Sequence, residues 1–200
     1  MDIEISFSLV DFYRSQFDEG LQKFDHALQK VPYPTGREYL AWFYFLAGRE
    51  EEARRILEAL EPDLFGTSDI TITPSDWQTV IAAAGTLVNA GEQARATYLI
   101  DSVLELIESD EASDYDYVKS FQIITANVIR GDKDTAVTTL RKVFDSGWRD
   151  GWWVLRAPLF ESMRGDPRWV AITDELAADI AMQRAWFEEH KNDELFQSRQ

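Results

Sequence analysis

The chain has 200 residues, of which 45% are hydrophobic and 28% are charged; this composition is typical of a globular domain and excludes disordered and fibrous classes. Its 36 acidic and 20 basic residues give a net charge of −16, which disfavours nucleic acids and anionic membrane surfaces as partners. The sequence has no cysteine, so disulfide frameworks, thiolate zinc sites and cysteine nucleophiles are excluded.

The N-terminal segment carries Asp2 and Glu4 where a secretory signal peptide needs basic residues. The longest apolar run, 39–47, is about half as long as a bilayer span requires. We therefore expect a cytoplasmic chain without membrane insertion, and we interpret the run as a buried helix.

Three glycines, Gly48, Gly91 and Gly131, mark an internal repeat. Each follows an apolar stretch with helical periodicity and precedes an alanine by five residues and aliphatic side chains by nine and twelve residues. The matching residues are Ala53, Leu57 and Leu60, then Ala96, Ile100 and Val103, then Ala136, Leu140 and Val143. The shared spacing predicts three helical hairpins, in which glycine ends the first helix in the left-handed conformation and alanine lets the second helix approach closely.

A fourth, degenerate copy precedes these three, with Gly20, Phe24 and Ala27 at the repeat positions and Ser15 where the hinge glycine belongs. We expect a single all-α domain, 1–200, made of a degenerate repeat (8–30), repeats at 36–60, 74–109 and 114–146, and a C-terminal cap (147–191). Helices are predicted at 8–30, 36–47, 49–60, 74–90, 92–109, 114–130, 132–146, about 157–163 and 167–190. Thr73-Pro74 and Asp166-Pro167 are good helix starts.

The best copy, Leu40-Ala41…Tyr44…Gly48…Ala53…Leu57…Leu60…Pro62, resembles the tetratricopeptide repeat. Leu87 and Asn127 replace the tyrosine in the other copies, and the hinges are 43 and 40 residues apart, against about 34 in the standard repeat. The resemblance implies a tetratricopeptide-like α-α superhelix of antiparallel hairpins, whose first helices form a concave binding surface and whose last repeat is closed by a C-terminal capping helix.

The C-terminal segment is similar to the end of tetratricopeptide modules attached to bacterial signalling proteins, such as adenylate cyclases and winged-helix regulators. The residues that carry this similarity are Leu155-Arg156-Ala157-Pro158-Leu159-Phe160 and Arg164-Gly165-Asp166-Pro167-Arg168-Trp169. It implies an accessory interaction module and brings no catalytic residue with it.

Chemical motifs are lacking. The two histidines, His26 and His190, have no metal-ligand spacing, so we read them as surface residues. The acids between Asp101 and Asp116 lack the central glycine of a calcium loop, so we read them as a solvated loop with helix capping by Ser113 or Asp114; a landing patch for a basic partner is the alternative. Phosphate-binding loops are also absent. We predict no catalytic residue, cofactor site or metal site, and a protein that is not an enzyme.

Tryptophan is concentrated in the C-terminal segment, at Trp148, Trp152, Trp153 and Trp169. We predict that these side chains form a hydrophobic lid over the last repeat with Leu155, Leu159 and Phe160, and that Trp152 and Trp169 are mostly buried against 114–146. An aromatic ligand pocket is the alternative.

Counting back from the hinges, the family's groove positions fall at Glu38, Tyr39, Trp42 and Phe45, at Gln78, Ala82 and Asn89, and at Val118, Gln122 and Thr125. Our partner-binding candidates among them are Tyr39, Trp42, Gln78, Asn89, Gln122 and Thr125. The alternative is that Trp42 and Phe45 pack inside. We predict a non-catalytic module that binds a protein or peptide, with self-association as the second hypothesis.

Overall fold

The computed structural model describes residues 10–12, 14–30, 36–109, 117–149 and 152–191. Their elements are α2 (Phe17–Lys30), α3 (Gly36–Leu46), α4 (Glu50–Leu60), η1 (Pro62–Phe65), η2 (Pro74–Asp76), α5 (Trp77–Asn89), α6 (Gln93–Ser109), α7 (Tyr117–Arg130), α8 (Lys133–Asp145), η3 (Trp152–Arg156), η4 (Pro158–Met163) and α9 (Pro167–His190). None of these residues lies in a strand, which confirms the all-α prediction for the described part of the chain.

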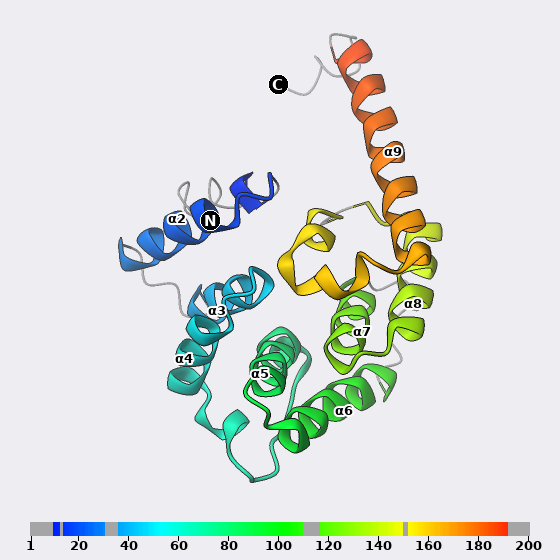
Figure 1. Ribbon diagram of the computed structural model, residues 1–200. Helices are drawn as coiled ribbons and strands as arrows, with labels where there is room; N and C mark the ends of the chain where they lie inside the picture. Colours follow the sequence, from blue (N-terminus) through cyan, green and yellow to red (C-terminus); the bar gives the residue numbers. More distant parts are fainter. Residues whose placement is uncertain (1–9, 13, 31–35, 110–116, 150–151, 192–200) are drawn as a thin grey trace.

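Helices that are neighbours in the sequence pack as antiparallel pairs: α3 with α4, α5 with α6, and α7 with α8. The pairs form an arc in which α3, α5 and α7 make an inner row and α4, α6 and α8 an outer row (Figure 1). The segment 152–166, which contains η3 and η4, lies on the inner side of the arc, between the inner row and α9 (Figure 1). The fold therefore places side chains of the inner row opposite a C-terminal segment that is distant in sequence.

The three hinge glycines end the first helix of each pair, as predicted. Gly48, Gly91 and Gly131 have φ of +71°, +81° and +84°, which confirms the expected left-handed conformation. At Gly48 the hinge amide donates to the Phe45 carbonyl at 3.0 Å and the next amide donates to a carbonyl five residues back, and the other two hinges repeat this pattern. These two bonds satisfy carbonyls that the end of a helix leaves without partners.

The degenerate first copy keeps the same hinge geometry without glycine. Ser15 has a φ of +61°, its amide donates to the Phe12 carbonyl at 2.9 Å, and the Gln16 amide donates to the Asp11 carbonyl at 2.9 Å. The continuous helix predicted over 8–30 is therefore wrong, because this turn separates 10–12 from α2, which begins at Phe17.

Helix α5 is the centre of the core and packs against α3, α4, α6 and α7. Ten of its thirteen residues are buried. Gly85 faces Phe45 of α3 so closely that a Cβ at Gly85 would overlap two atoms of the phenyl ring. The missing side chain thus sets the distance between two neighbouring inner helices.

The C-terminal segment packs on the arc in two places, with η4 against α3 and α7 and with α9 against α8. Trp148, Trp153 and Trp169 are buried, and the Trp169 ring stacks on Phe160 at 5.6 Å. Trp152, which we predicted to be mostly buried, is only half-buried. It lines a hollow between η3 and the first half of α9.

Helix α9 packs against α8 through its first half and then extends away from the body (Figure 1). Its buried residues, Trp169, Ile172 and Leu176, all lie in that first half. No helix in the described part of the chain is both long enough and apolar enough to span a lipid bilayer.

Candidate functional site

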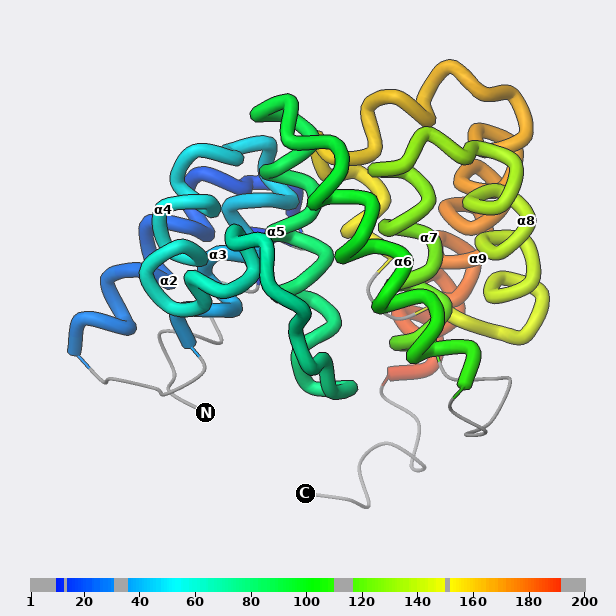
Figure 2. The backbone as a smooth tube through the Cα atoms, turned by 90° about the horizontal axis from the view of Figure 1, so that it is seen from below, coloured from blue at the N-terminus to red at the C-terminus, as the bar shows by residue number. Residues whose placement is uncertain are grey.

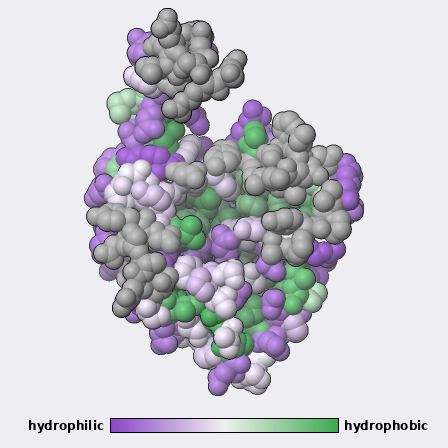
Figure 3. All heavy atoms as spheres, turned by 180° about the vertical axis from the view of Figure 1, so that it is seen from behind, coloured by the Kyte–Doolittle hydropathy of each residue, from purple (hydrophilic) through white to green (hydrophobic). Residues whose placement is uncertain are grey.

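A hollow of about 370 Å³ lies between the inner row of helices and the C-terminal segment. Figure 3 shows hydrophobic surface gathered in a depression on the face of the molecule opposite to that of Figure 1. The lining residues are Tyr39, Trp42, Phe43 and Leu46 of α3, Gln78 of α5, Tyr117, Val118, Phe121 and Gln122 of α7, and Trp148, Trp153 and Val154 of the C-terminal segment. We call this site the aromatic hollow.

The repeat explains why these residues meet. First helices of successive hairpins run in the same direction, and Figure 2 shows α5 and α7 doing so side by side. The lining residues Gln78 and Val118 are each the second residue of their helix, and Tyr39 is the fourth residue of α3. The N-terminal ends of the three inner helices therefore lie on the same face of the arc.

Aromatic contacts fix the walls. The Trp42 ring meets Phe121 edge to face, with centroids 6.4 Å apart and planes at 83°. Phe43 stacks on Phe12 at 4.3 Å and lies 6.5 Å from Trp153. The walls are therefore formed by packed rings from α3, α7 and the C-terminal segment.

The rim is apolar and accessible. Tyr39 is 45% exposed and Val118 is 59% exposed, although both side chains are large and apolar. Exposed apolar side chains grouped around a concavity are typical of interaction surfaces.

Gln122 is the polar feature of the hollow. Its side chain is 1% exposed, and its Oε1 has no hydrogen-bond partner among the residues that the structure describes. A buried amide oxygen without a donor costs about 1–3 kcal/mol. A ligand that carries a hydrogen-bond donor is therefore favoured in the hollow.

The electrostatic surroundings are negative. Burial, and then the charges of Glu61 and Asp76, raise the pKa of Glu38, which precedes Tyr39 on the rim. None of the described lining residues carries a charge. The lining is therefore uncharged, and we call the nearby group Glu38, Glu61 and Asp76, which lies outside the lining, the acidic edge.

Of the six candidates predicted from the sequence, the structure brings together Tyr39, Trp42, Gln78 and Gln122. Trp42 is 4% exposed, so it packs inside, as the alternative held, while one side of it still lines the hollow. Val118 also lines it.

The remaining candidates lie elsewhere. Asn89 is exposed at the C-terminal end of α5, eleven residues after Gln78 and about 16 Å away along the helix axis. Thr125 is fully buried, and its hydroxyl donates to the Phe121 carbonyl at 2.9 Å. Both assignments to a common groove are therefore wrong. Phe45 and Ala82, which are 1% and 0% exposed, are core residues.

Sequence reasoning missed the contribution of the C-terminal segment. Trp148 and Trp153 were predicted as lid residues, with an aromatic ligand pocket as the alternative, and neither reading placed them beside the groove candidates that line the hollow with them. The signal was present in the tryptophan cluster, because a lid on the concave side of an arc must face the inner helices.

The other candidates for chemistry give no site. His26 is exposed on α2, whereas His190 stacks on Trp186 at the far end of α9. In the described part of the chain, no group of three or more His, Asp or Glu side chains is arranged to hold a metal ion. Of the acids between Asp101 and Asp116, those at 110–116 lie outside the described residues, and Asp101 pairs with Arg130.

Comparisons with known proteins identify no relative: no protein-family model, curated protein or solved structure matches the chain.

Proposed function

We propose that the protein is a non-catalytic, tetratricopeptide-like recognition module that binds a segment of another protein in the aromatic hollow. Its concave site is formed by the first helices of the hairpins, as the family resemblance implies. The resemblance of the tail to modules of bacterial signalling proteins supports a role as an accessory domain of such a protein.

Gln122 is the observation that carries the proposal. A buried amide oxygen without a donor lowers the stability of the fold, and replacement by an apolar side chain of similar size removes that cost. We expect the Gln122 side chain to turn toward a bound peptide, so that an N–H group of the peptide donates to Oε1, which is buried in the unbound protein. The free-energy cost of the unpaired Oε1 is then removed when the peptide binds, which favours binding.

Shape and charge define the partner. A volume of about 370 Å³ is at the small end of binding pockets and accommodates one or two large side chains rather than a whole domain. The acidic edge around Glu38 favours Lys or Arg beside them. The occupant is therefore a segment with an aliphatic or aromatic anchor flanked by basic residues.

Self-association is disfavoured by the same charges. A second copy of a chain with a net charge of −16 brings like charge to an acidic edge. Light scattering at high protein concentration separates the two hypotheses, since the proposal predicts a monomer and self-association predicts a dimer.

The experiment is a selection of phage-displayed random dodecapeptides on the wild-type protein, followed by affinity measurements with the selected peptides. We expect an apolar anchor flanked by Lys or Arg, with binding that weakens as salt rises. Tyr39→Ala and Val118→Ala should each weaken binding by about fivefold to tenfold, as expected for apolar contacts at a hot spot. Met182→Ala is the matched control, because Met182 is 65% exposed on α9, away from the hollow.

Gln122→Met separates binding from folding. We expect it to raise the free energy of unfolding by about 1–2 kcal/mol while it weakens peptide binding. Selected peptides that are acidic, or that bind the Tyr39 and Val118 variants as tightly as the wild type, would overturn the proposal.

A further inference from the structure

A second hollow, of about 410 Å³, lies on the opposite side of η3, between this segment and the first half of α9. One wall carries Trp152, Leu155 and Arg156, and the other carries Trp169 and Leu176. It shares no lining residue with the aromatic hollow. Trp153 and Val154 line the aromatic hollow, whereas Trp152 and Leu155 line the second hollow.

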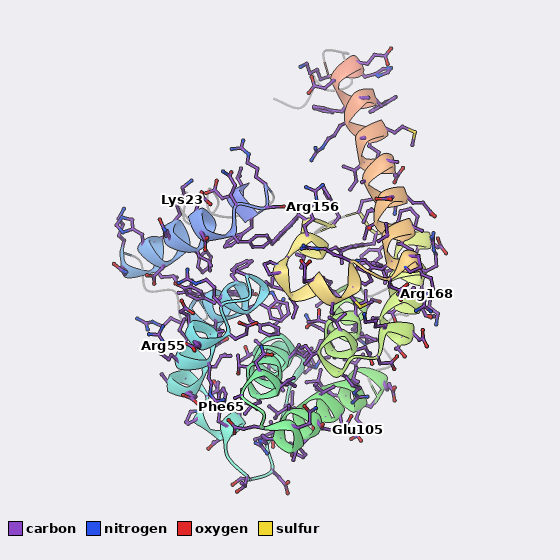
Figure 4. All side chains as sticks on the ribbon, viewed as in Figure 1. Lys23, Arg55, Phe65, Glu105, Arg156 and Arg168 are labelled. Carbon is purple, nitrogen blue, oxygen red and sulfur yellow. The ribbon has the colours of Figure 1, made fainter. Side chains whose placement is uncertain are left out.

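Arg156 is an exposed base on the wall of this hollow. Figure 4 labels four bases, and two of them, Lys23 and Arg168, form ion pairs that contrast with the surroundings of Arg156. Lys23 pairs with Asp11 at 2.5 Å, and Arg168 pairs with Asp166 and Asp134 at 2.7 Å. The guanidinium of Arg156 has no carboxylate partner among the described residues and lies 3.9 Å from the centroid of the Trp152 ring.

The charge next to Arg156 is repulsive. Partial burial, and then the positive charge of Arg184 on α9, lower the pKa of Arg156. Two neighbouring guanidinium groups that repel each other are stabilised by an anion placed between them or against one of them. Asp174 lines the same hollow, but no described carboxylate forms an ion pair with Arg156, so this role is open to a ligand.

Arg164 has a different task, although it also lines the hollow. Its guanidinium donates to the Arg156 carbonyl at 2.8 Å and pairs with Glu161. Arg164 therefore binds the backbone that carries Arg156, and its charge is paired with Glu161.

The rest of the lining defines the ligand. Apolar surface from Trp152, Leu155 and Leu176 suits a hydrocarbon or aromatic body. Asp174 also lines the hollow, and its negative charge opposes a dianion such as phosphate more than a monoanion. The combination selects a single carboxylate on an apolar body.

We propose that this second hollow binds a small monoanionic organic carboxylate, held through its carboxylate by Arg156 and through its apolar body by the Trp152 side. Arg184 strengthens the attraction at longer range. This site is independent of the proposed partner-binding function, so either can fail without the other.

The test is a titration of the 15N-labelled protein with 3-phenylpropionate, followed by NMR through the indole N–H signal of Trp152, which a Trp152→Phe variant assigns. We expect saturable shifts of this signal. Arg156→Gln should weaken binding by about tenfold, as expected for a charged hydrogen bond, and Arg184→Gln should weaken it by a smaller factor. Arg37→Gln is the matched control, since Arg37 is an exposed arginine on α3, away from this hollow.

Two further probes separate the contributions of charge and apolar body. The neutral 3-phenylpropanol should bind much more weakly than 3-phenylpropionate, and inorganic phosphate should not compete with it. The proposal is overturned if no saturable shift occurs, if Arg156→Gln binds as the wild type does, or if phenylpropanol or phosphate binds as tightly as the carboxylate.

Discussion

Gly85→Ala isolates the packing that holds the inner row together. In an exposed helix interior this change stabilises by about 1 kcal/mol, because alanine has the higher helix propensity. At Gly85 the added methyl would overlap Cε2 and Cζ of Phe45, at a separation that real Cβ atoms essentially never show. Phe45 is 1% exposed and packs on Trp42 at 5.9 Å, so its ring has no free space to enter.

Overpacking of this kind costs about 1–3 kcal/mol, and the confinement of Phe45 favours the upper end. After the gain in helix propensity, we expect a net loss of about 2 kcal/mol in the free energy of unfolding. For a chain of this length, that loss lowers the Tm by about 4–8 °C. Urea unfolding followed by circular dichroism measures the change directly.

Two variants serve as controls. Gly91→Ala adds a methyl that meets nothing within 4 Å, so it should cost only the strain of a φ of +81°, about 1–2 kcal/mol. Phe45→Leu should relieve Gly85→Ala, so that the double variant is more stable than the sum of the single changes predicts, by at least about 0.5 kcal/mol. Unchanged or higher stability of Gly85→Ala, or strict additivity with Phe45→Leu, would refute the close approach of α3 and α5.

Other consequences concern the C-terminal cap. Trp169→Ala should lower the free energy of unfolding by about 3–5 kcal/mol because Trp169 is 2% exposed. Trp152→Ala should lower it clearly less, because Trp152 is only half-buried. Equal losses in urea unfolding would contradict this placement. Asp166 caps α9 by accepting from the Arg168 amide at 2.9 Å, and its side-chain bond to Arg168 lowers its pKa to about 2. A carboxylate whose pKa is lowered by folding stabilises the folded protein at pH values above its ordinary pKa, and this stabilisation is lost as the pH falls through the lowered pKa. Asp166→Asn should therefore lower the Tm at pH 7 by an amount that shrinks between pH 4 and pH 2. A difference in Tm that is constant over this range would contradict the charged cap.

The hinges could be predicted from the sequence because they are local. A helix that ends in a left-handed residue needs glycine at one position and little else, so three glycines with shared spacing locate three helix ends. Ser15 shows the limit of this reasoning, because it adopts the same conformation with a φ of +61° although serine does not favour it. The predicted continuous helix over 8–30 was wrong for that reason.

The candidate site could be predicted only in part because it depends on tertiary placement. Tyr39, Gln78 and Gln122 lie near the N-terminal ends of inner helices, where parallel first helices bring them together. Asn89 was assigned by the family register, yet it lies about three turns further along α5. The burial of Gln122 and the entry of Trp153 into the hollow follow from the C-terminal segment folding back onto the concave side, which no local pattern specifies.

Cross-linking of a selected peptide to the protein is the most direct test that the aromatic hollow is the binding site. The peptide carries a photoreactive diazirine in place of its apolar anchor, and mass spectrometry identifies the cross-linked residues. The account predicts cross-links to the rim and lining, at Tyr39, Tyr117, Val118 or Phe121, and their loss when unlabelled peptide competes. Competed cross-links confined to the outer helices α4, α6 and α8 would contradict it.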